Sequence, residues 1–144
     1  MVFALPMLIN IVYAVFPPIG ENTPPQSKAW WVEIVEQVSR ILYLLAVTFL
    51  VSQNPLNWRS VWLYLAAAFL ILYYIVWIRY FVGGRDTALL GKPFLFVPIP
   101  LAVFPVTYFL CAAVFLNNIP AAVIMCVFGA AHITVSVRSF HKKG

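Results

Sequence analysis

The chain is poor in charge of either sign. Its 144 residues include nine Lys or Arg and four Asp or Glu, whereas 64% of the residues are apolar and the mean hydropathy is +0.96. An average soluble domain is about one quarter charged, so these few charges cannot cover the surface of a soluble globule of this size. The composition excludes a soluble enzyme and a disordered tail, and it predicts a chain surrounded by a lipid bilayer.

Cysteine and recognisable catalytic motifs are also scarce. Cys111 and Cys126 lie singly inside apolar runs, without the CxxC or Cys/His spacing of a metal or redox centre. The sequence contains no GxSxG, HExxH or phosphate-loop pattern. The formal net charge of +5 is scattered along the chain, which excludes a nucleic-acid-binding patch. We therefore expect no disulfide framework, no metal, no cofactor, no catalytic residue and no nucleic-acid partner.

The first residues are apolar but lack the features of a targeting segment. No basic region precedes residues 2–16, and no small-residue cleavage site follows them. Neither end of the sequence carries a lipidation motif. The sequence predicts neither a cleaved signal peptide nor a lipid anchor.

Five apolar stretches predict an all-α integral membrane protein, a single domain over residues 1–144 with five transmembrane helices. A membrane-spanning helix needs about 20 residues, and the predicted spans are 2–16, 29–52, 58–82, 93–116 and 120–140. The first stretch is short and carries Pro6 and Asn10, so four spans plus a re-entrant or short N-terminal segment is the alternative. The fourth stretch contains several prolines, which predict irregular backbone in its first half.

The basic residues predict how the helices are oriented. With five spans, Arg59 stands alone on one side of the membrane, and the other side collects Lys28, Arg79, Arg85, Lys92, Arg138, Lys142 and Lys143. Cytoplasmic loops carry the excess of Lys and Arg. The sequence therefore predicts a multi-pass protein of the cytoplasmic membrane with its C-terminus in the cytoplasm and its N-terminus outside.

The second stretch carries three charges within the predicted span. Glu33, Glu36 and Arg40 follow one another at spacings of three and four residues, which places them on one helix face. Each charge costs about 2.5–3.5 kcal/mol at the centre of a membrane helix. One interpretation is an intramembrane acid that faces a cavity and binds a cation or carries a proton. The alternative is that Glu36 and Arg40 neutralise each other and extend to the cytoplasmic headgroups.

His132 lies at a depth similar to that of these charges. At 1.5 Å per residue, both Arg40 and His132 are about 18 Å from the outer ends of their segments, and Tyr73 and Tyr74 are about 23 Å from theirs. We predict that Glu33, Glu36, Arg40, His132 and one of the two tyrosines form a binding site for a small ligand or an ion. A histidine that only packs in its helix is the alternative for His132.

Two further features lie outside this cluster. Arg79, Arg85 and Lys92 surround the turn that follows the third stretch and could bind a lipid phosphate; a solvated loop that fixes topology is the alternative. In the last stretch, small residues recur every four positions, which permits close approach of another helix of the same chain or of a second copy. These small residues are Ala122, Cys126, Ala130 and Thr134.

The function expected from these features is binding or transport of a small solute or ion. Five short spans enclose little volume, so transport would require a homo-oligomer or a larger membrane partner. The first alternative is a non-catalytic accessory or assembly subunit of a membrane complex. A lipid-modifying enzyme at the inner leaflet ranks last, because the sequence offers no clear general base beside a headgroup site.

Overall fold

The chain folds into an all-helical structure. The computed structural model describes residues 4–16, 19, 30–50, 54–86 and 88–141, and for Trp30, Glu33 and residues 139–141 it describes the backbone alone. Within these ranges there is no strand, and the helices are α1 (Ala4–Val15), α2 (Trp30–Phe49), α3 (Val61–Val82), α4 (Ala88–Gly91), α5 (Pro100–Phe115) and α6 (Ile119–His141).

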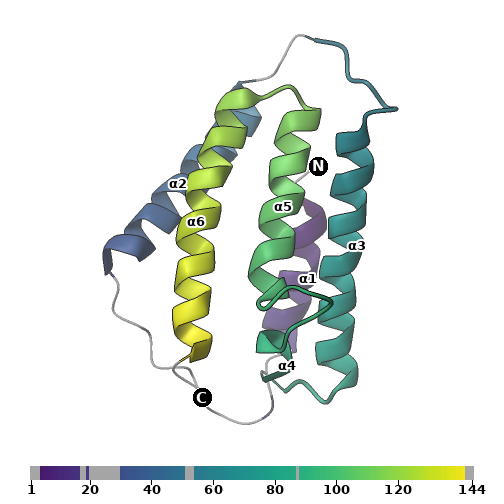
Figure 1. Cartoon of the computed structure of the whole chain (residues 1–144), viewed down its shortest axis with the longest axis vertical. Helices are drawn as coiled ribbons and strands as arrows, with labels where there is room; N and C mark the ends of the chain where they lie inside the picture. The colour runs from purple at the N-terminus through teal and green to yellow at the C-terminus, as the bar shows by residue number, and fades with distance from the viewer. Residues whose placement is uncertain (1–3, 17–18, 20–29, 51–53, 87, 142–144) are drawn as a thin grey trace.

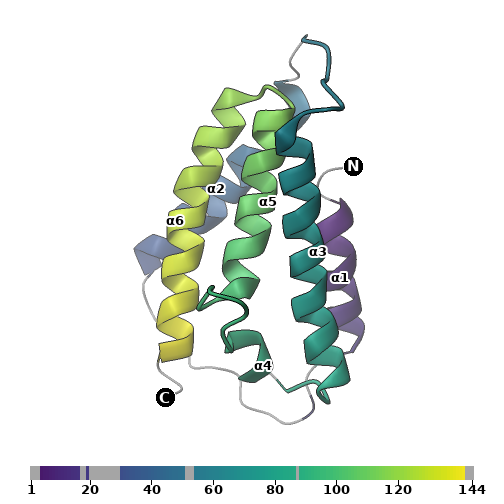
Figure 2. The same cartoon turned by 45° about the vertical axis from the view of Figure 1, so that its right-hand side comes forward.

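The helices form an elongated bundle with α5 between α3 and α6 (Figures 1 and 2). Helix α2 crosses obliquely and packs on α6, and the short α1 packs against α3. The end of α3, the short α4, the beginning of α5 and the end of α6 lie at the lower end of Figure 1. We call this end the α4 end of the bundle.

Two helices are long and apolar enough to cross a membrane by length and composition, α3 and the Ile119–Arg138 part of α6. The 22 residues of α3 extend over about 33 Å at 1.5 Å per residue. The other two apolar helices are shorter, with 12 residues in α1 and 16 in α5. These findings favour a membrane location, and they leave the count of five spans as a prediction.

Local sequence explains where the helices begin and end. The Ser60 hydroxyl accepts a hydrogen bond from the Trp62 amide and so caps the first turn of α3. At the other end of α3, Gly84 adopts φ +83°, and the Arg85 amide donates to the Tyr80 carbonyl at 3.0 Å. This closing bond over a left-handed residue ends the helix at the predicted glycine turn.

More of the fourth stretch is helical than its prolines predict. Residues 92–99 are non-helical, and a tight turn pairs Phe94 with Val97. Helix α5 then begins at Pro100 and continues through Pro105, so the irregular half ends earlier than expected. A proline inside a helix costs about 3 kcal/mol, which the packing of α5 against both α3 and α6 offsets. The sequence also failed to predict α4, a single turn between two loops.

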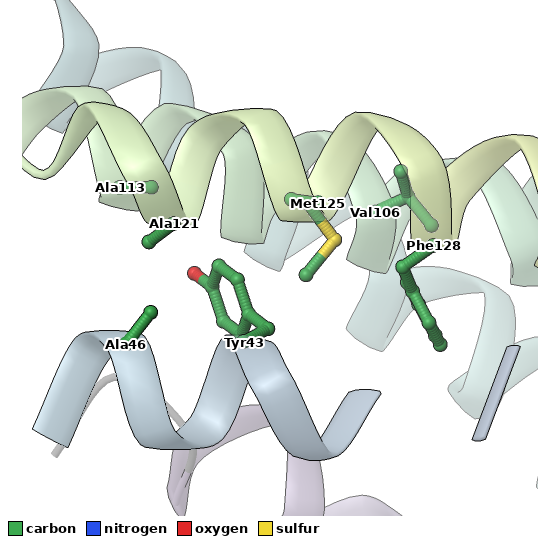
Figure 3. Packing of buried hydrophobic residues seen from close by; sticks show 7 residues of the cluster. All are labelled: Tyr43, Ala46, Val106, Ala113, Ala121, Met125 and Phe128. Atoms are coloured by element: carbon green, nitrogen blue, oxygen red, sulfur yellow. The ribbon is translucent and has the colours of Figure 1, made fainter. Parts of the chain in front are cut away.

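The core around α2, α5 and α6 is shown in Figure 3. Tyr43 projects from α2 toward α6, where Ala121 and Met125 are buried. Its hydroxyl donates to the Phe109 carbonyl of α5 at 2.8 Å. The buried Asn118 donates to the Ala46 and Leu50 carbonyls at 3.0 and 2.8 Å and accepts from the Ala121 amide. These bonds fix the end of α2 to the start of α6.

A second core joins α3, α4 and α5. It contains Tyr73, Val76, Trp77, Tyr80, Leu90 and Phe104. Tyr13 of α1 lies with its ring centroid 5.1 Å from that of Trp77. The aromatic side chains of α3 therefore hold both the first helix and the loop before α5.

The small-residue stripe of α6 faces away from the bundle. Cys126, Ala130 and Thr134 are exposed, whereas Ala122 is half-buried and packs against the core around Tyr43. Packing within the chain, one of the two roles expected for this stripe, therefore accounts for Ala122 and leaves the other three positions on the outer surface. Close contact with α5 occurs at Gly129 instead, where an added Cβ would lie 2.6 Å from Cγ1 of Val106. The stripe is therefore free to contact another molecule.

Candidate binding site in the helix bundle

Three of the predicted site residues meet between α2 and α6. One carboxylate oxygen of Glu36, Oε1, lies 3.0 Å from Arg40 Nη2 and 2.9 Å from His132 Nδ1. A carboxylate can only accept, so Nδ1 of His132 donates the proton of that hydrogen bond. Glu36 is 7% exposed, and 96 positions separate it from His132. The depth argument from the sequence thus predicted a pair of residues far apart in the chain.

Phe128 contacts both groups that donate to this carboxylate. The rings of Phe128 and His132 stack with centroids 5.2 Å apart and an interplanar angle of 12°. The guanidinium carbon of Arg40 lies 5.6 Å from the centroid of the same ring, a favourable cation–π distance. One aromatic side chain therefore orients both groups that bind Glu36.

The pairing only partly matches the expectation that Glu36 and Arg40 neutralise each other and extend to the headgroups. The two side chains do pair, and the side chain of Arg40 is 42% exposed. Glu36, however, stays covered, with 9% of its side chain exposed, and takes a third partner from α6. Mutual neutralisation alone would not require His132.

A cavity of about 360 Å³ adjoins this cluster. Arg40 and His132 line it from α2 and α6, and Asn10 and Tyr73 line it from α1 and α3. The remaining walls are mostly apolar and come from α1, α2, α3, α5 and α6; they include Pro6, Met7, Leu44, Trp77, Ile99, Leu101, Ala102, Pro105, Phe109, Met125 and Phe128. Pockets of this size with a few polar groups are typical of small-molecule sites.

The start of α5, in the proline-rich fourth stretch, lines the cavity. Ile99 immediately precedes α5 and Pro105 lies in its second turn, and both are lining residues. Proline lacks an amide hydrogen, which leaves this part of α5 with fewer internal hydrogen bonds. The packed neighbours on both sides keep the segment helical.

The two tyrosines have different positions. Tyr73 lines the cavity, and its hydroxyl donates to Asn10 Oδ1 at 3.2 Å, away from the glutamate cluster. The Tyr74 hydroxyl instead donates to the Leu5 carbonyl of α1, and Tyr74 is not among the lining residues. The side chain of Glu33, also predicted for this site, lies outside the described residues.

Of the three residues predicted to bind a lipid phosphate, Arg79 binds its own loop. The guanidinium of Arg79 donates to the backbone carbonyls of Leu89, Lys92 and Pro93 and lies 5.6 Å from the Phe94 ring. Arg79 therefore holds the loop between α3 and α5 in place. Only Arg85 and Lys92 keep side chains available for a headgroup.

Sequence reasoning missed four polar or aromatic contributors to the site. Phe128 and Ser136 lie four residues to either side of His132, on the same face of α6, so helical spacing could have found them. Asn10 was noticed in the first segment, but no depth argument connected it to Tyr73. Trp77 lies near the end of its stretch, a position typical of interfacial aromatics, whereas its indole nitrogen is buried.

The site does not have the composition of a metal centre. Within the described part of the chain, no three His, Cys, Asp or Glu side chains gather closely enough to hold a metal ion. Comparison with protein-family models, curated proteins and solved structures finds no match. Function must therefore be argued from the geometry of the cavity.

Proposed function

We propose that this chain is a multi-pass protein of the cytoplasmic membrane that binds a small solute or ion in its central cavity and moves it as part of an oligomer. The observation that carries the proposal is the Glu36–Arg40–His132 cluster at one wall of a cavity of about 360 Å³. Ionisable groups within membrane helices usually mark a ligand or ion path.

The distribution of basic residues supports the proposed orientation. Among the described residues, Arg79, Arg85, Lys92 and Arg138 belong to segments at the α4 end, and Arg59 belongs to the loop at the opposite end. The positive-inside rule then makes the α4 end cytoplasmic. We propose that α1, α2, α3, α5 and α6 cross the membrane, with the N-terminus outside and the C-terminus in the cytoplasm.

Reporter fusions test this topology. A fluorescent protein fused at the C-terminus should fluoresce, and alkaline phosphatase inserted beside Arg59 should be active, because the first reporter needs the cytoplasm and the second needs the outside. Phosphatase activity at the C-terminus would contradict the orientation. If a reporter at the N-terminus is found in the cytoplasm, α1 is a re-entrant helix and not a span. Its length of only about 18 Å at 1.5 Å per residue would fit that result.

Cysteine labelling tests whether the cavity admits solutes. Leu44 lines the cavity, and its neighbour Leu45 is 47% exposed on the outer face of α2. In a Cys126→Ala background, Leu44→Cys should react with a charged methanethiosulfonate in membranes. Leu45→Cys should not react, because a thiol in hydrocarbon does not form the reactive thiolate. Equal lack of reaction at both positions would refute a solute-accessible cavity.

The outward stripe of α6 favours a second candidate function, that of an accessory subunit which binds a larger membrane partner. Small exposed residues at four-residue spacing permit close helix contact in a membrane. In this case Glu36→Gln and His132→Ala would leave binding to the membrane partner unchanged, whereas Ala130→Leu would abolish that binding. The solute-binding proposal predicts instead that Glu36→Gln and His132→Ala reduce solute binding.

The same stripe provides a test of self-association. Cys126 is an exposed cysteine at its centre. If two copies meet through this face around a two-fold axis, oxidation in membranes should link them through Cys126, and Cys126→Ala should abolish the link. A chain that stays monomeric in lipid under oxidation would remove the oligomer from the proposal.

A further inference from the structure

Two lining residues of the cavity, Arg40 and Trp77, have hydrogen-bond donors without an acceptor in the described chain. The guanidinium of Arg40 has five N–H groups, and within the described chain it makes one hydrogen bond, to Glu36. The indole N–H of Trp77, a lining residue that is 4% exposed, finds no acceptor among the described residues. A ligand that fills the cavity must therefore supply acceptor atoms.

The carboxylate of the cluster does not line the cavity. Glu36 is not among the lining residues, whereas both groups that donate to its oxygen are. The ion pair consequently presents its cationic side to the cavity. A cation would meet Arg40 first and would gain no anionic partner from the lining residues, so the arrangement favours an anion.

The walls define the rest of the ligand. The Phe128 ring supports Arg40, and Phe109 and Trp77 contribute further aromatic surface. Aromatic rings at a pocket wall favour flat apolar groups, which stack or make edge contacts with them. The volume of about 360 Å³ suits a compact molecule and is too small for a diacyl lipid.

We propose that the cavity binds a small organic monoanion, a carboxylate on a flat apolar ring. Arg40 donates to the carboxylate, and the Trp77 indole donates to an oxygen on the ring. A planar guanidinium matches the two oxygens of a carboxylate better than a point charge does. This inference rests on the proposed solute-binding function, whose substrate class it names.

The test uses one aromatic body with three different charges. The probes are 6-hydroxy-2-naphthoate and the alcohol and the amine that carry the same ring, titrated by calorimetry into the full chain in lipid nanodiscs, with empty nanodiscs subtracted. We expect saturable binding of the carboxylate at one site per chain. The alcohol should bind about tenfold more weakly or worse, because it loses the charge-assisted hydrogen bond, and the amine should not bind.

Variants assign the binding to the two donors. Arg40→Gln should raise the Kd of the carboxylate about tenfold or more, and Arg40→Lys should recover part of the loss while keeping a cation beside Glu36. Trp77→Phe should weaken binding of hydroxynaphthoate but not of naphthoate, which lacks the ring hydroxyl. Arg138→Gln is the matched control, because Arg138 is exposed and does not line the cavity; it should change nothing.

The outcomes separate this inference from the proposed function. Binding of the alcohol or the amine as tight as that of the carboxylate overturns the inference, and so does binding of the carboxylate that Arg40→Gln leaves unchanged. Absence of any saturable carboxylate binding by the folded wild type also overturns it. In each case, reaction of Leu44→Cys with the charged reagent would still support a solute-accessible cavity. Absence of that reaction would refute the proposed function itself.

Discussion

The contact between Glu36 and His132 connects two helices, so its strength can be measured as a coupling between them. The variants are Glu36→Gln, His132→Phe and the double substitution. Gln keeps the shape of the side chain and an accepting oxygen but removes the charge, and Phe keeps the stacking on Phe128 but removes the donor. Glu36→Gln thus weakens the interaction by removing the charge, and His132→Phe removes it, each with little change in packing.

The expected magnitude follows from the geometry. His132 Nδ1 lies 2.9 Å from a carboxylate oxygen that is also bonded to Arg40. A hydrogen bond to a charged group contributes about 1.5–3 kcal/mol net. Because the amide oxygen introduced by Glu36→Gln can still accept a neutral hydrogen bond, we expect the two single variants to lose about 1–3 kcal/mol each, and the coupling energy to be about 1–2 kcal/mol.

The assay is reversible unfolding of the purified chain in mixed micelles, followed by circular dichroism. The matched control combines Glu36→Gln with Ser60→Ala, which removes a helix cap in α3 and shares no partner with Glu36. That pair should be additive to within about 0.5 kcal/mol. A coupling of Glu36 with His132 that is no larger than the control would refute the contact and the cluster built on it.

Three further substitutions test the fold around the site. Asn118→Ala should lower the unfolding free energy by about 2–4 kcal/mol, because three hydrogen bonds of a buried side chain are each worth about 1 kcal/mol; Asn117→Ala, at a neighbouring exposed residue with φ +54°, should cost less in the same measurement. Gly129→Leu should lower the midpoint of thermal unfolding, since even a Cβ would clash with Val106, whereas a stable variant would contradict the α5–α6 contact. Arg79→Ala should expose the loop between α3 and α5 to proteolysis, because three backbone carbonyls lose their donor. Arg85→Ala is the control that should leave the cleavage rate unchanged.

Hydrophobic patterning predicted most of the helical fold. The turn at Gly83 and Gly84 ends α3 as expected, because a left-handed residue is needed there and glycine adopts that conformation without strain. The extent of the fourth stretch was harder to predict, because Pro105 tolerates the helix only when α3 and α6 pack against α5. Such long-range support is not visible in a local pattern.

The candidate site was predictable where depth in the membrane determined it. Glu36, Arg40 and His132 come together because their helices run in opposite directions and place them at similar depth. Depth does not specify which way a side chain points around its helix axis. Tyr73 and Tyr74 are adjacent in depth, yet only Tyr73 faces the cavity. The same missing information explains why Arg79, expected at a headgroup site, binds its own loop instead.

The orientation of α2 explains why a helix with several charges belongs in this bundle. Val38, Ile41 and Leu45 are exposed on its outer side, and Glu36 is buried on its inner side. Neutralising Glu36 for a structural purpose requires one cation, and Arg40 provides it from the next turn of the same helix. The hydrogen bond from His132 adds a second donor, at the edge of a cavity that an apolar core would have filled. A carboxylate with more partners than neutrality requires, beside a cavity, supports the proposed binding role, since buried ion pairs seldom stabilise a fold beyond what apolar residues would.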